Sequence, residues 1–177
     1  RLERSGPRYT SYPTADRFVE AFGPDAYRIW TAKRNIGGII RPLSLYVHIP
    51  FCDSPCFYCA CNKIITRDES IVENYLHYLE REIAVQGELF RSEPDVVQLH
   101  WGGGTPTYLK HDELRQLMAT IRSHFRLAAE GEYSVEIDPR TADGETMAVL
   151  ADLGFNRASF GVQDFDSVVQ KAVNRVQ

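Results

Sequence analysis

From residue 44 onward, hydrophobic and polar positions follow two alternating patterns. Four segments place apolar side chains at every second position, which predicts half-buried β-strands. Between these segments, apolar residues recur three or four positions apart, which predicts helices with one buried stripe. The predicted strands are Ser44–Pro50, Val96–Gly102, Tyr133–Pro139 and Arg157–Gln163, and the predicted helices cover about Ser70–Leu89, Leu114–Phe125 and Asp143–Leu153, with a last one that begins near Ser167.

Two of these helices carry local signals for their ends. Ser70 and Glu73 form a capping-box pair at the start of the longest predicted helix. Gly154 is placed as the C-terminal cap of the helix that ends near Leu153, because glycine readily adopts the left-handed conformation that often ends a helix.

Strands that alternate with helices predict a parallel sheet with helices on its outer face. In the second strand, Val97, Leu99 and Trp101 are predicted on the buried face, whereas Gln98 and His100 lie on the other. A polar second face is not expected for strands that helices cover on both sides. We therefore predict an α/β fold: a partial (β/α) barrel whose interior is a ligand chamber and whose chemistry lies at the carboxyl ends of its strands.

The first part of the chain lacks this alternation. Several prolines interrupt residues 1–42, which we interpret as an irregular N-terminal arm. A short helix is predicted around Asp25–Lys33, and Gly37 and Gly38 follow it as a break. Residues 43–177 then form the second predicted domain.

Composition and charge are those of an ordinary globular protein. The 177 residues suffice for one domain with a sizeable core, and hydrophobic residues make up 44% and charged residues 25% of them. A net charge of −4 gives no reason to expect nucleic-acid binding, and no apolar run reaches the length of a membrane span. Because the chain begins at Arg1 rather than Met and carries no stop signal at Gln177, we expect a fragment of a longer protein.

The cysteines of the chain, Cys52, Cys56, Cys59 and Cys61, all fall within ten residues. Thiolates clustered in this way are typical of a metal site. The first three have the spacing C-x3-C-x2-C and offer three ligands, and a metal centre that does chemistry keeps one coordination position open. The spacing therefore indicates a reactive metal centre, and the clustered thiols and the absence of an export signal favour a reducing cytoplasm.

Three kinds of site compete for these cysteines. A disulfide framework usually spreads its cysteines through a small secreted chain, unlike this single loop. A four-cysteine zinc site, with Cys61 as the last ligand, usually pairs two C-x2–4-C units across a longer loop, and this loop offers one such unit. An iron–sulfur cluster held by three thiolates is the preferred interpretation.

Polar residues on the inner faces of the strands are further candidates. Tyr46 could simply line the barrel, and His48 could be a proton donor, a carboxylate partner or a hydrogen-bonded structural residue. Glu136 needs a partner if it is buried, and Arg157 on the neighbouring strand could supply one. The turn Gly102–Thr107 lacks the Lys-Ser/Thr ending of a phosphate loop, so it is either a tight turn or a place where backbone approaches a ligand closely.

Several motifs, in order along the chain, resemble one family. The segment Tyr46-Val-His-Ile-Pro-Phe-Cys52, followed by C-x3-C-x2-C-x-C, resembles the radical S-adenosylmethionine (SAM) superfamily and, more closely, its oxygen-independent coproporphyrinogen III oxidases. Family members are much longer, so the resemblance implies that only the N-terminal units of a radical SAM barrel are present and that the remaining barrel and a C-terminal domain are absent. The other matching segments are Arg8–Thr14, Leu99–Thr107, Val135–Arg140, Phe160–Phe165 and Asn174-Arg175.

The resemblance implies cofactors and a reaction. Cys52, Cys56 and Cys59 would hold a [4Fe-4S] cluster whose fourth iron binds SAM, and one electron would cleave SAM into methionine and a 5′-deoxyadenosyl radical. The radical would remove a hydrogen atom from a propionate side chain of coproporphyrinogen III, and loss of carbon dioxide and one electron would leave a vinyl group. Two such rounds would give protoporphyrinogen IX, a step of anaerobic haem biosynthesis.

The site residues of the family carry over onto matching positions. Tyr46, Gly103 and Glu136 would contact the methionyl group, the amino group and the ribose of the first SAM. Cys61 and His48 are the catalytic candidates, and Cys61 stays free of the cluster in this interpretation. A second SAM would be lined by Tyr58, which departs from the Phe of some members, and by Gly104, Thr105, Gln163 and Arg175.

Two other functions are alternatives. A related haem-binding chaperone would keep the cluster motif but replace Cys61 and lack the arm segment Arg8–Pro13; this chain has both, which favours the enzyme. A zinc-stabilised interaction domain is the second alternative. For the enzyme we expect a one-electron donor such as a flavodoxin or ferredoxin, a monomeric state, and no membrane or nucleic-acid partner.

Overall fold

The structure is a computed structural model, and it describes residues 14–35, 41–90 and 95–177. The chain forms two compact units, Arg1–Ile39 and Ile40–Gln177. No helix among the described ranges is long and apolar enough to cross a membrane.

The first unit contains the predicted short helix. It is confirmed as α1, Pro24–Ala32, and a 3-10 turn, Ala15–Arg17, precedes it. Pro24 takes the first helical position, where its fixed φ suits the helix and its missing N–H costs no hydrogen bond. The arm segment before Thr14 and the predicted break at Gly37-Gly38 lie outside the described residues.

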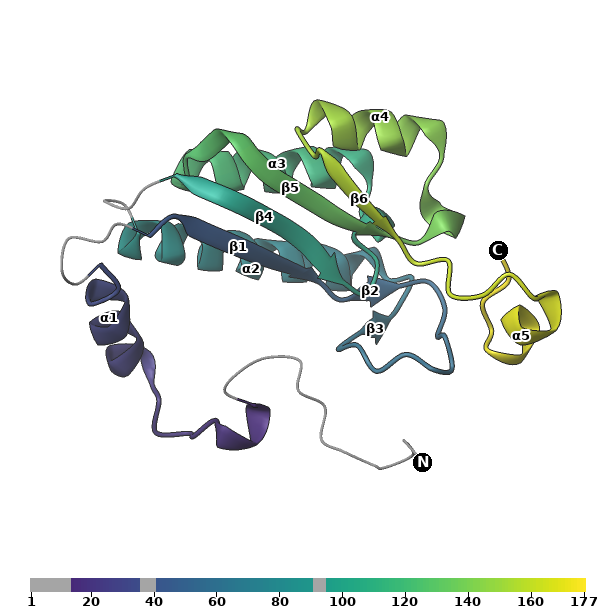
Figure 1. The fold of residues 1–177 in the computed structure, drawn as a ribbon, viewed down its shortest axis with the longest axis horizontal. Helices are drawn as coiled ribbons and strands as arrows, with labels where there is room; N and C mark the ends of the chain where they lie inside the picture. Colours follow the sequence, from purple (N-terminus) through teal and green to yellow (C-terminus); the bar gives the residue numbers. More distant parts are fainter. Residues whose placement is uncertain (1–13, 36–40, 91–94) are drawn as a thin grey trace, which may run out of the picture. The chain divides into compact units, whose positions relative to one another are not determined.

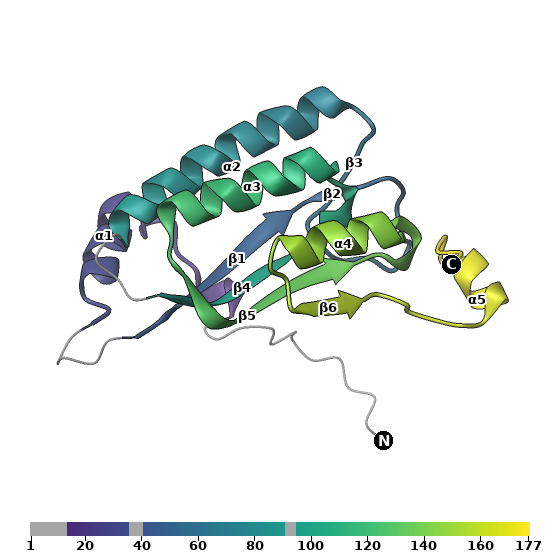
Figure 2. The same ribbon diagram turned by 90° about the horizontal axis from the view of Figure 1, so that it is seen from above.

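The second unit is a parallel sheet in the order β1-β4-β5-β6, as Figure 1 shows. Its helices α2, α3 and α4 cover one face of the sheet (Figure 2). The alternation of strands and helices read from the sequence is therefore confirmed. The strands are β1 (Leu43–Ile49), β4 (Val96–Gly103), β5 (Leu127–Ile137) and β6 (Arg157–Phe160), and the helices are α2 (Glu69–Leu89), α3 (His111–His124), α4 (Gly144–Asp152) and α5 (Ser167–Ala172).

Smaller elements sit at the carboxyl edge of the sheet, where β1 and β4 end. Strand β2 (Phe51–Cys52) pairs in parallel with β3 (Ile64–Ile65), and together they close the cysteine-containing loop. Two 3-10 turns, η3 (Pro106–Tyr108) and η4 (Pro139–Thr141), follow β4 and β5. This edge therefore gathers the loops that the sequence marked as candidates.

The hydrophobic core lies between the sheet and its helices. Leu99 and Trp101 of β4 are fully buried, and the Trp101 ring meets Phe155 edge-on with centroids 4.9 Å apart. Each such side chain stabilises the fold by about 1.5–3 kcal/mol through loss of its contact with water. The predicted stripe of α3 is buried at every position: Leu114, Leu117, Met118, Ile121 and the capping residue Phe125.

The second face of the sheet carries the polar side chains, as predicted. Tyr46 of β1 and Glu136 of β5 are exposed, and His100 and Ser134 between them are partly exposed. The Nδ1 atom of His100 lies 2.7 Å from the Ser134 hydroxyl, so neighbouring strands are linked by polar side chains on this face. A surface of this kind suits the lining of a ligand chamber rather than a packed core.

The predicted position of Val97 is wrong. A β-bulge shifts the register of β4 between Val96 and Gln98, so one extra residue sits in the strand. Val96 is 0% exposed and takes the buried place, whereas Val97 is 36% exposed. Beyond the bulge the alternation returns, and the rest of the strand follows the prediction.

The predicted capping box of α2 is also wrong. The N-cap is Asp68, whose carboxylate accepts a hydrogen bond from the backbone N–H of Ser70 at 2.9 Å. An aspartate caps a helix as well as a serine does, and it lies one residue before Glu69, where the helix begins. The predicted end of α4 is confirmed, because Gly154 follows the C-cap with φ of +89°.

Strand β6 is shorter than predicted. It ends at Phe160, and all four of its side chains are exposed, because β5 is its one neighbour in the described sheet. Gln163 then turns the chain with φ of +70° toward α5.

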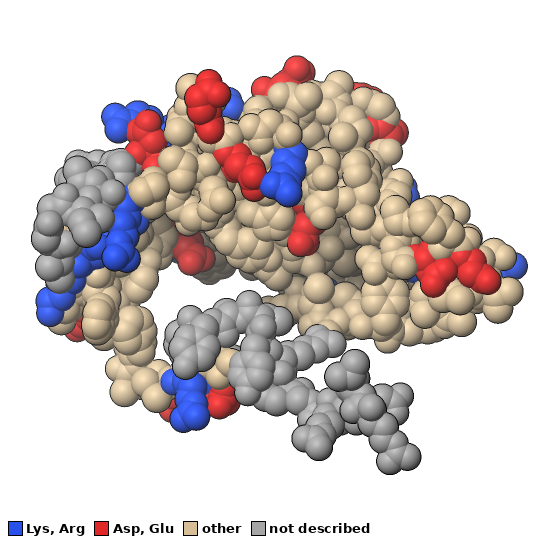
Figure 3. All heavy atoms as spheres, viewed as in Figure 1, with Lys and Arg blue, Asp and Glu red and all other residues tan. Residues whose placement is uncertain are grey.

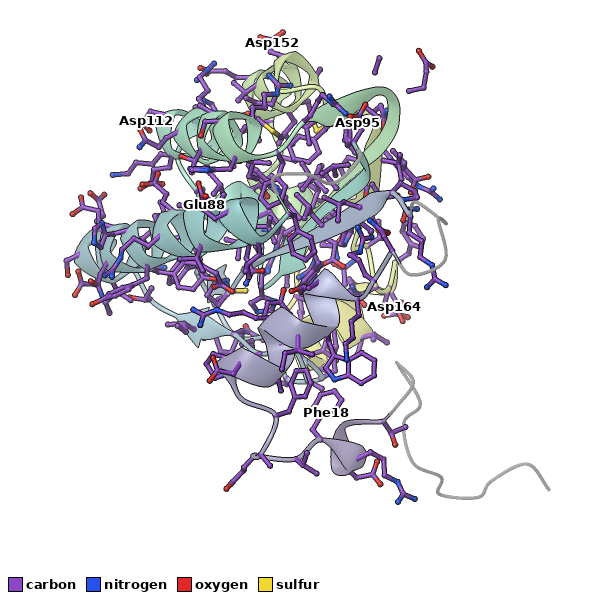
Figure 4. All side chains as sticks on the ribbon, turned by 90° about the vertical axis from the view of Figure 1, so that its left-hand side faces the viewer. Phe18, Glu88, Asp95, Asp112, Asp152 and Asp164 are labelled. Carbon is purple, nitrogen blue, oxygen red and sulfur yellow. The ribbon has the colours of Figure 1, made fainter. Side chains whose placement is uncertain are left out.

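Charged side chains are spread over the surface seen in Figure 3, where acidic and basic groups lie among uncharged ones. Figure 4 labels Asp95, which lies just before β4 and forms an ion pair with Arg126, just before β5. This pair marks the amino edge of the sheet, opposite the edge that holds the cysteine loop.

Candidate cluster and cofactor site

A cavity of about 460 Å³ lies at the carboxyl edge of the sheet. Its size is that of a small-molecule site. The loops after β1, β4, β5 and β6 all contribute to it, so the shared location predicted for these loops is confirmed. Its lining includes Cys52, Cys56, Cys59, Cys61, Tyr58, Gly103, Gly104, Thr105, Glu136, Asp138, Arg140, Gln163 and Arg175.

The base of the cysteine loop is anchored in the core. Phe51 is fully buried and packs its ring against those of Tyr75 and Tyr108, with centroids 5.3 and 5.7 Å away. The backbone N–H of Thr66 donates to the carbonyl of Cys52 at 3.3 Å and so closes the loop. The first cysteine therefore has a fixed position, with a half-buried thiol.

The four thiols are free, and all four line the cavity. Cys52, Cys56 and Cys59 are half-buried, and Cys61 is exposed. Burial raises the pKa of the Cys52 thiol above its usual range, and the neighbouring thiols add to this, although the Thr105 hydroxyl opposes it. Burial and the neighbouring Cys59 likewise raise the pKa of Cys61. Metal cations would reverse this repulsion, because thiolates that coordinate a metal are deprotonated.

The thiols surround the cavity without converging on one point. Within the described ranges, no three His, Cys, Asp or Glu side chains lie close enough together to hold a single metal ion. Soft thiolate donors around a space of this size fit a polynuclear iron–sulfur cluster, which the C-x3-C-x2-C loop would hold through Cys52, Cys56 and Cys59.

The glycine-rich turn packs flush against the start of the cysteine loop. Gly103 has φ of +117°, and a Cβ added at Gly104 would lie 2.6 Å from the carbonyl oxygen of Pro50. Only glycine allows this approach without a shift of backbone. The turn thereby brings the Thr105 hydroxyl to 3.5 Å from the Cys52 sulfur.

Glu136 faces the cavity and binds the turn. Its Oε2 accepts a hydrogen bond from the backbone N–H of Gly103 at 3.1 Å, and its Oε1 lies 3.5 Å from the Nε2 of His100. The predicted alternative, a salt bridge from Arg157, is wrong: Arg157 pairs with Glu132 at 2.7 Å. The reason is the strand register, since Ser159 of β6, rather than Arg157, lies opposite Glu136.

Tyr46 and His48 form a hydrogen-bonded pair on β1. The His48 Nε2 lies 2.8 Å from the carbonyl oxygen of Asn62, which can only accept, so Nε2 carries a proton. In the neutral ring, Nδ1 then accepts from the Tyr46 hydroxyl at 3.0 Å. Burial, together with the charge of Glu136, raises the pKa of Tyr46. The Tyr46 ring also stacks on His100, with centroids 5.7 Å apart. The contact to Asn62 gives His48 a structural hydrogen bond, and the catalytic role of His48 stays a prediction.

Asp138 is a buried carboxylate that sequence reasoning placed at this edge but gave no role. It is 6% exposed, and its Oδ2 lies 2.7 Å from Arg140 and 2.9 Å from Arg175. Burial alone would raise the pKa of Asp138, but the hydrogen bonds from Arg140 and the charge of Arg175 outweigh it and hold the pKa below its usual value. The signal in the sequence was an acidic residue directly after a strand, followed closely by an arginine.

The two arginines around Asp138 also approach one cysteine. The Nη1 of Arg175 lies 3.4 Å from the sulfur of Cys56, and an Nη2 of Arg140 lies 4.0 Å from it. Arg175 is 8% exposed, and its Nε has no hydrogen-bond partner among the described residues. Positive charge at this sulfur suits a thiolate, and Arg175 also lines the cavity, where its guanidinium is a candidate group for binding an anionic ligand.

The structure thus brings together most of the predicted site residues. Gly103 and Glu136, predicted for the first SAM, line the same cavity as the four cysteines, whereas Tyr46 and His48 lie outside its lining on the neighbouring polar face. The residues predicted for the second SAM all line it: Tyr58, Gly104, Thr105, Gln163 and Arg175.

Comparison with known proteins identifies the family. The radical SAM superfamily matches residues 46–177, which include every loop around the cavity. The chain belongs to the radical SAM superfamily. Radical SAM proteins use a [4Fe-4S] cluster and S-adenosylmethionine, so these are the cofactors of this chain, and its donor set fits them.

Individual radical SAM relatives match nearly the whole chain. The oxygen-independent coproporphyrinogen III oxidase of Pseudomonas aeruginosa is 54% identical over 100% of this chain, and that of Escherichia coli is 50% identical over 98% of it. The solved structure of coproporphyrinogen III oxidase from Escherichia coli, described as a radical SAM enzyme, superposes with a TM-score of 0.89 at 48% identity over 96% of this chain. The predicted fold, the N-terminal units of a radical SAM α/β barrel, is therefore confirmed.

This radical SAM chain spans only part of those proteins. It covers 38% of the Pseudomonas aeruginosa relative, 37% of the Escherichia coli relative and 38% of the solved chain.

Proposed function

We propose that the full-length protein with this chain is an oxygen-independent coproporphyrinogen III oxidase. The observation that carries the proposal is that relatives with this name match the chain at 54% and 50% identity over nearly all of its length. Those same relatives favour the oxidase over the haem-binding chaperone considered from the sequence.

The proposed reaction converts two propionate side chains of coproporphyrinogen III into vinyl groups. Each propionate loses one hydrogen atom, one molecule of carbon dioxide and one electron, which passes to a one-electron carrier. When bound, the cluster and SAM supply the one-electron chemistry that makes abstraction of a hydrogen atom from an unactivated carbon possible. The part of the protein is to bind, orient and shield the reacting groups.

Three thiolates do the first part of this work. In the proposal, Cys52, Cys56 and Cys59 would be the protein ligands of the cluster, and SAM would bind at the position that they leave open. The glycine turn supports this arrangement, because Gly103 presents backbone to the cavity and its N–H orients Glu136. Glu136 would bind the ribose of the first SAM, next to Tyr46, whose hydroxyl is hydrogen-bonded to His48.

A second group of residues binds carboxylates in the proposal. Arg175 is fixed by Asp138 and faces the cavity beside Tyr58 and Gln163. Its guanidinium, always charged, suits the carboxylate of a second SAM, and its neighbour Arg140 suits a substrate propionate.

Cys61 is the catalytic candidate among the thiols. Its side chain is exposed at the cavity, beside Cys59, where a thiol that is not a ligand can reach substrate. His48 is the second candidate, through its bond to the Tyr46 hydroxyl. We further propose a flavodoxin or ferredoxin as the electron donor, a monomeric protein, and the reducing cytoplasm as its location, since four free thiols suit that compartment.

Anaerobic turnover by the full-length protein tests the proposal. The reconstituted protein, with dithionite and SAM, should convert coproporphyrinogen III to protoporphyrinogen IX through a mono-vinyl intermediate, with release of carbon dioxide. Stoichiometric haem binding with an intact cluster and no turnover would instead support the chaperone.

A further inference from the structure

Two short segments far apart in the sequence hold each other at the cavity. The first, Pro55–Phe57, contains the middle cysteine of the cluster motif, and the second, Val173–Arg175, follows α5. Three consecutive residues of one segment contact three consecutive residues of the other. The backbone N–H of Phe57 donates to the carbonyl of Val173 at 3.1 Å. The Asn174 Nδ2 donates to the carbonyl of Pro55 at 2.7 Å. The Arg175 Nη1 lies 3.4 Å from the Cys56 sulfur.

Asn174 has an unusual backbone conformation that makes these contacts possible. Its φ is +54°, in the left-handed region that few residues other than glycine adopt, although asparagine tolerates it better than most. The turn ends α5 and sends the chain back toward the cysteine loop. It lets the Asn174 amide reach Pro55 while the next residue, Arg175, points its guanidinium at Cys56.

The cysteine loop has anchors on both sides of Cys56. Its base is fixed by Phe51 in the core, and its far end by the Lys63 ammonium, which donates to the carbonyl of Cys59 at 2.9 Å. Cys56 lies between these two anchors, and the bond from Asn174 holds the carbonyl directly before it.

We propose that Asn174 is a positioning residue for the iron–sulfur cluster. By holding the Pro55 carbonyl it keeps the Cys56 thiolate where it can bind iron and face Arg175. Retention of the cluster therefore depends on a side chain that is not a cluster ligand and that follows β6 and α5 in the sequence. The inference requires the cluster but not the proposed action on coproporphyrinogen III.

Two substitutions of Asn174 separate its amide from its backbone conformation. Asn174→Gly keeps the left-handed turn and removes the donor, and Asn174→Asp keeps the size and places a carboxylate oxygen against the Pro55 carbonyl. Asn156→Gly is the control, because the Asn156 Nδ2 donates to the carbonyl of Gly131 at 2.8 Å at the other end of the sheet. The Asn156 Oδ1 also accepts from the backbone N–H of Tyr133 at 2.9 Å, so this control removes one hydrogen bond more than Asn174→Gly does.

The measurement is the rate at which the anaerobically reconstituted, full-length protein loses iron to a ferrous chelator. We expect Asn174→Gly to lose iron roughly three- to tenfold faster than the wild type, the factor that one lost hydrogen bond gives, and Asn174→Asp to lose it faster still. In the metal-free protein, alkylation of Cys56 followed by mass spectrometry should accelerate in the same order. Asn156→Gly should lower the thermal midpoint and leave the iron-loss rate unchanged.

Equal iron-loss rates in the wild type and Asn174→Gly would overturn the inference. So would an equal acceleration in Asn156→Gly, since general destabilisation would then explain the effect. Neither measurement needs substrate. If the iron-loss rates of the wild type and the variants follow the expected order but the protein does not act on coproporphyrinogen III, the proposed function alone is contradicted.

Discussion

Asp138 offers a sharp test of how the site is held, because one buried carboxylate balances two guanidinium groups beside Cys56. Replacement by the near-isosteric amide, Asp138→Asn, removes the negative charge and leaves Arg140 and Arg175 facing each other. The amide oxygen can still accept the backbone N–H of Arg140, which Asp138 accepts at 3.0 Å. The substitution therefore isolates the charge from the local turn.

The magnitude follows from the burial of the partners. The side chains of Asp138 and Arg175 are 5% and 10% exposed, and loss of one partner from a buried ion pair costs about 3–5 kcal/mol. Arg140 is 28% exposed and can turn to water, so we expect a loss of about 3 kcal/mol, the low end of that range.

The cost of Asp138→Asn should also depend on pH. The folded-state pKa of Asp138 is lowered, so its stabilising charge is fully present above the unfolded pKa of about 3.9 and is lost as the pH falls through the lower, folded value. The difference in unfolding free energy between wild type and variant should stay constant from pH 7 to pH 5. It should shrink below about pH 4.

The assay is urea unfolding of the metal-free, full-length protein, followed by circular dichroism at several pH values. Asp95→Asn is the matched control: Asp95 also pairs with an arginine, Arg126, but those side chains are 39% and 77% exposed. The control should cost less than about 1 kcal/mol. The reasoning about the buried carboxylate would be refuted by either of two results. One is that Asp138→Asn lowers the free energy of unfolding no more than Asp95→Asn does. The other is that Asp138→Asn lowers it as much at pH 3 as at pH 7.

Three further predictions concern the cavity. Cys61→Ser should bind a full complement of iron and show the wild-type absorption spectrum but lose turnover, whereas a parallel loss of iron would make Cys61 a ligand. Gly104→Ala should destabilise the protein by about 1–3 kcal/mol in thermal unfolding, because the Cβ of the alanine would lie 2.6 Å from the Pro50 carbonyl oxygen. Gly144→Ala is the control: a Cβ at Gly144 meets open space, so this substitution should change stability little or raise it. Glu136→Gln should weaken SAM binding about tenfold, as measured by anaerobic calorimetry, because a charge-assisted hydrogen bond that becomes neutral loses roughly 1.4 kcal/mol. An unchanged affinity for SAM would show that Glu136 is not part of the SAM site.

Local pattern was enough to predict the strands and helices of the second unit. Strict alternation of apolar and polar residues works where one face of a strand is buried, and the stripe of α3 was read correctly because every third or fourth side chain packs on the sheet. The bulge at Val97 could not be predicted, since Val96 and Val97 are equally apolar and the choice between them depends on pairing with β1 and β5.

The site was predicted less completely, because its contacts join distant segments. The motif residues around the cysteines and the glycine turn could be named from spacing and resemblance. The roles of Asp138 and Asn174 could not, since each depends on a partner from another loop: Arg175 for Asp138, and Pro55 for Asn174. The wrong partner for Glu136 has the same origin, because strand register decides which of two glutamates Arg157 can reach.

The central claim is that three thiolates hold a [4Fe-4S] cluster and leave one iron open to SAM. Electron paramagnetic resonance of the reduced, anaerobically reconstituted full-length protein, recorded with and without SAM, tests it most directly. The account predicts a [4Fe-4S] signal whose g-values shift when SAM is added. A signal that ignores SAM, or a colourless protein with stoichiometric zinc, would contradict it.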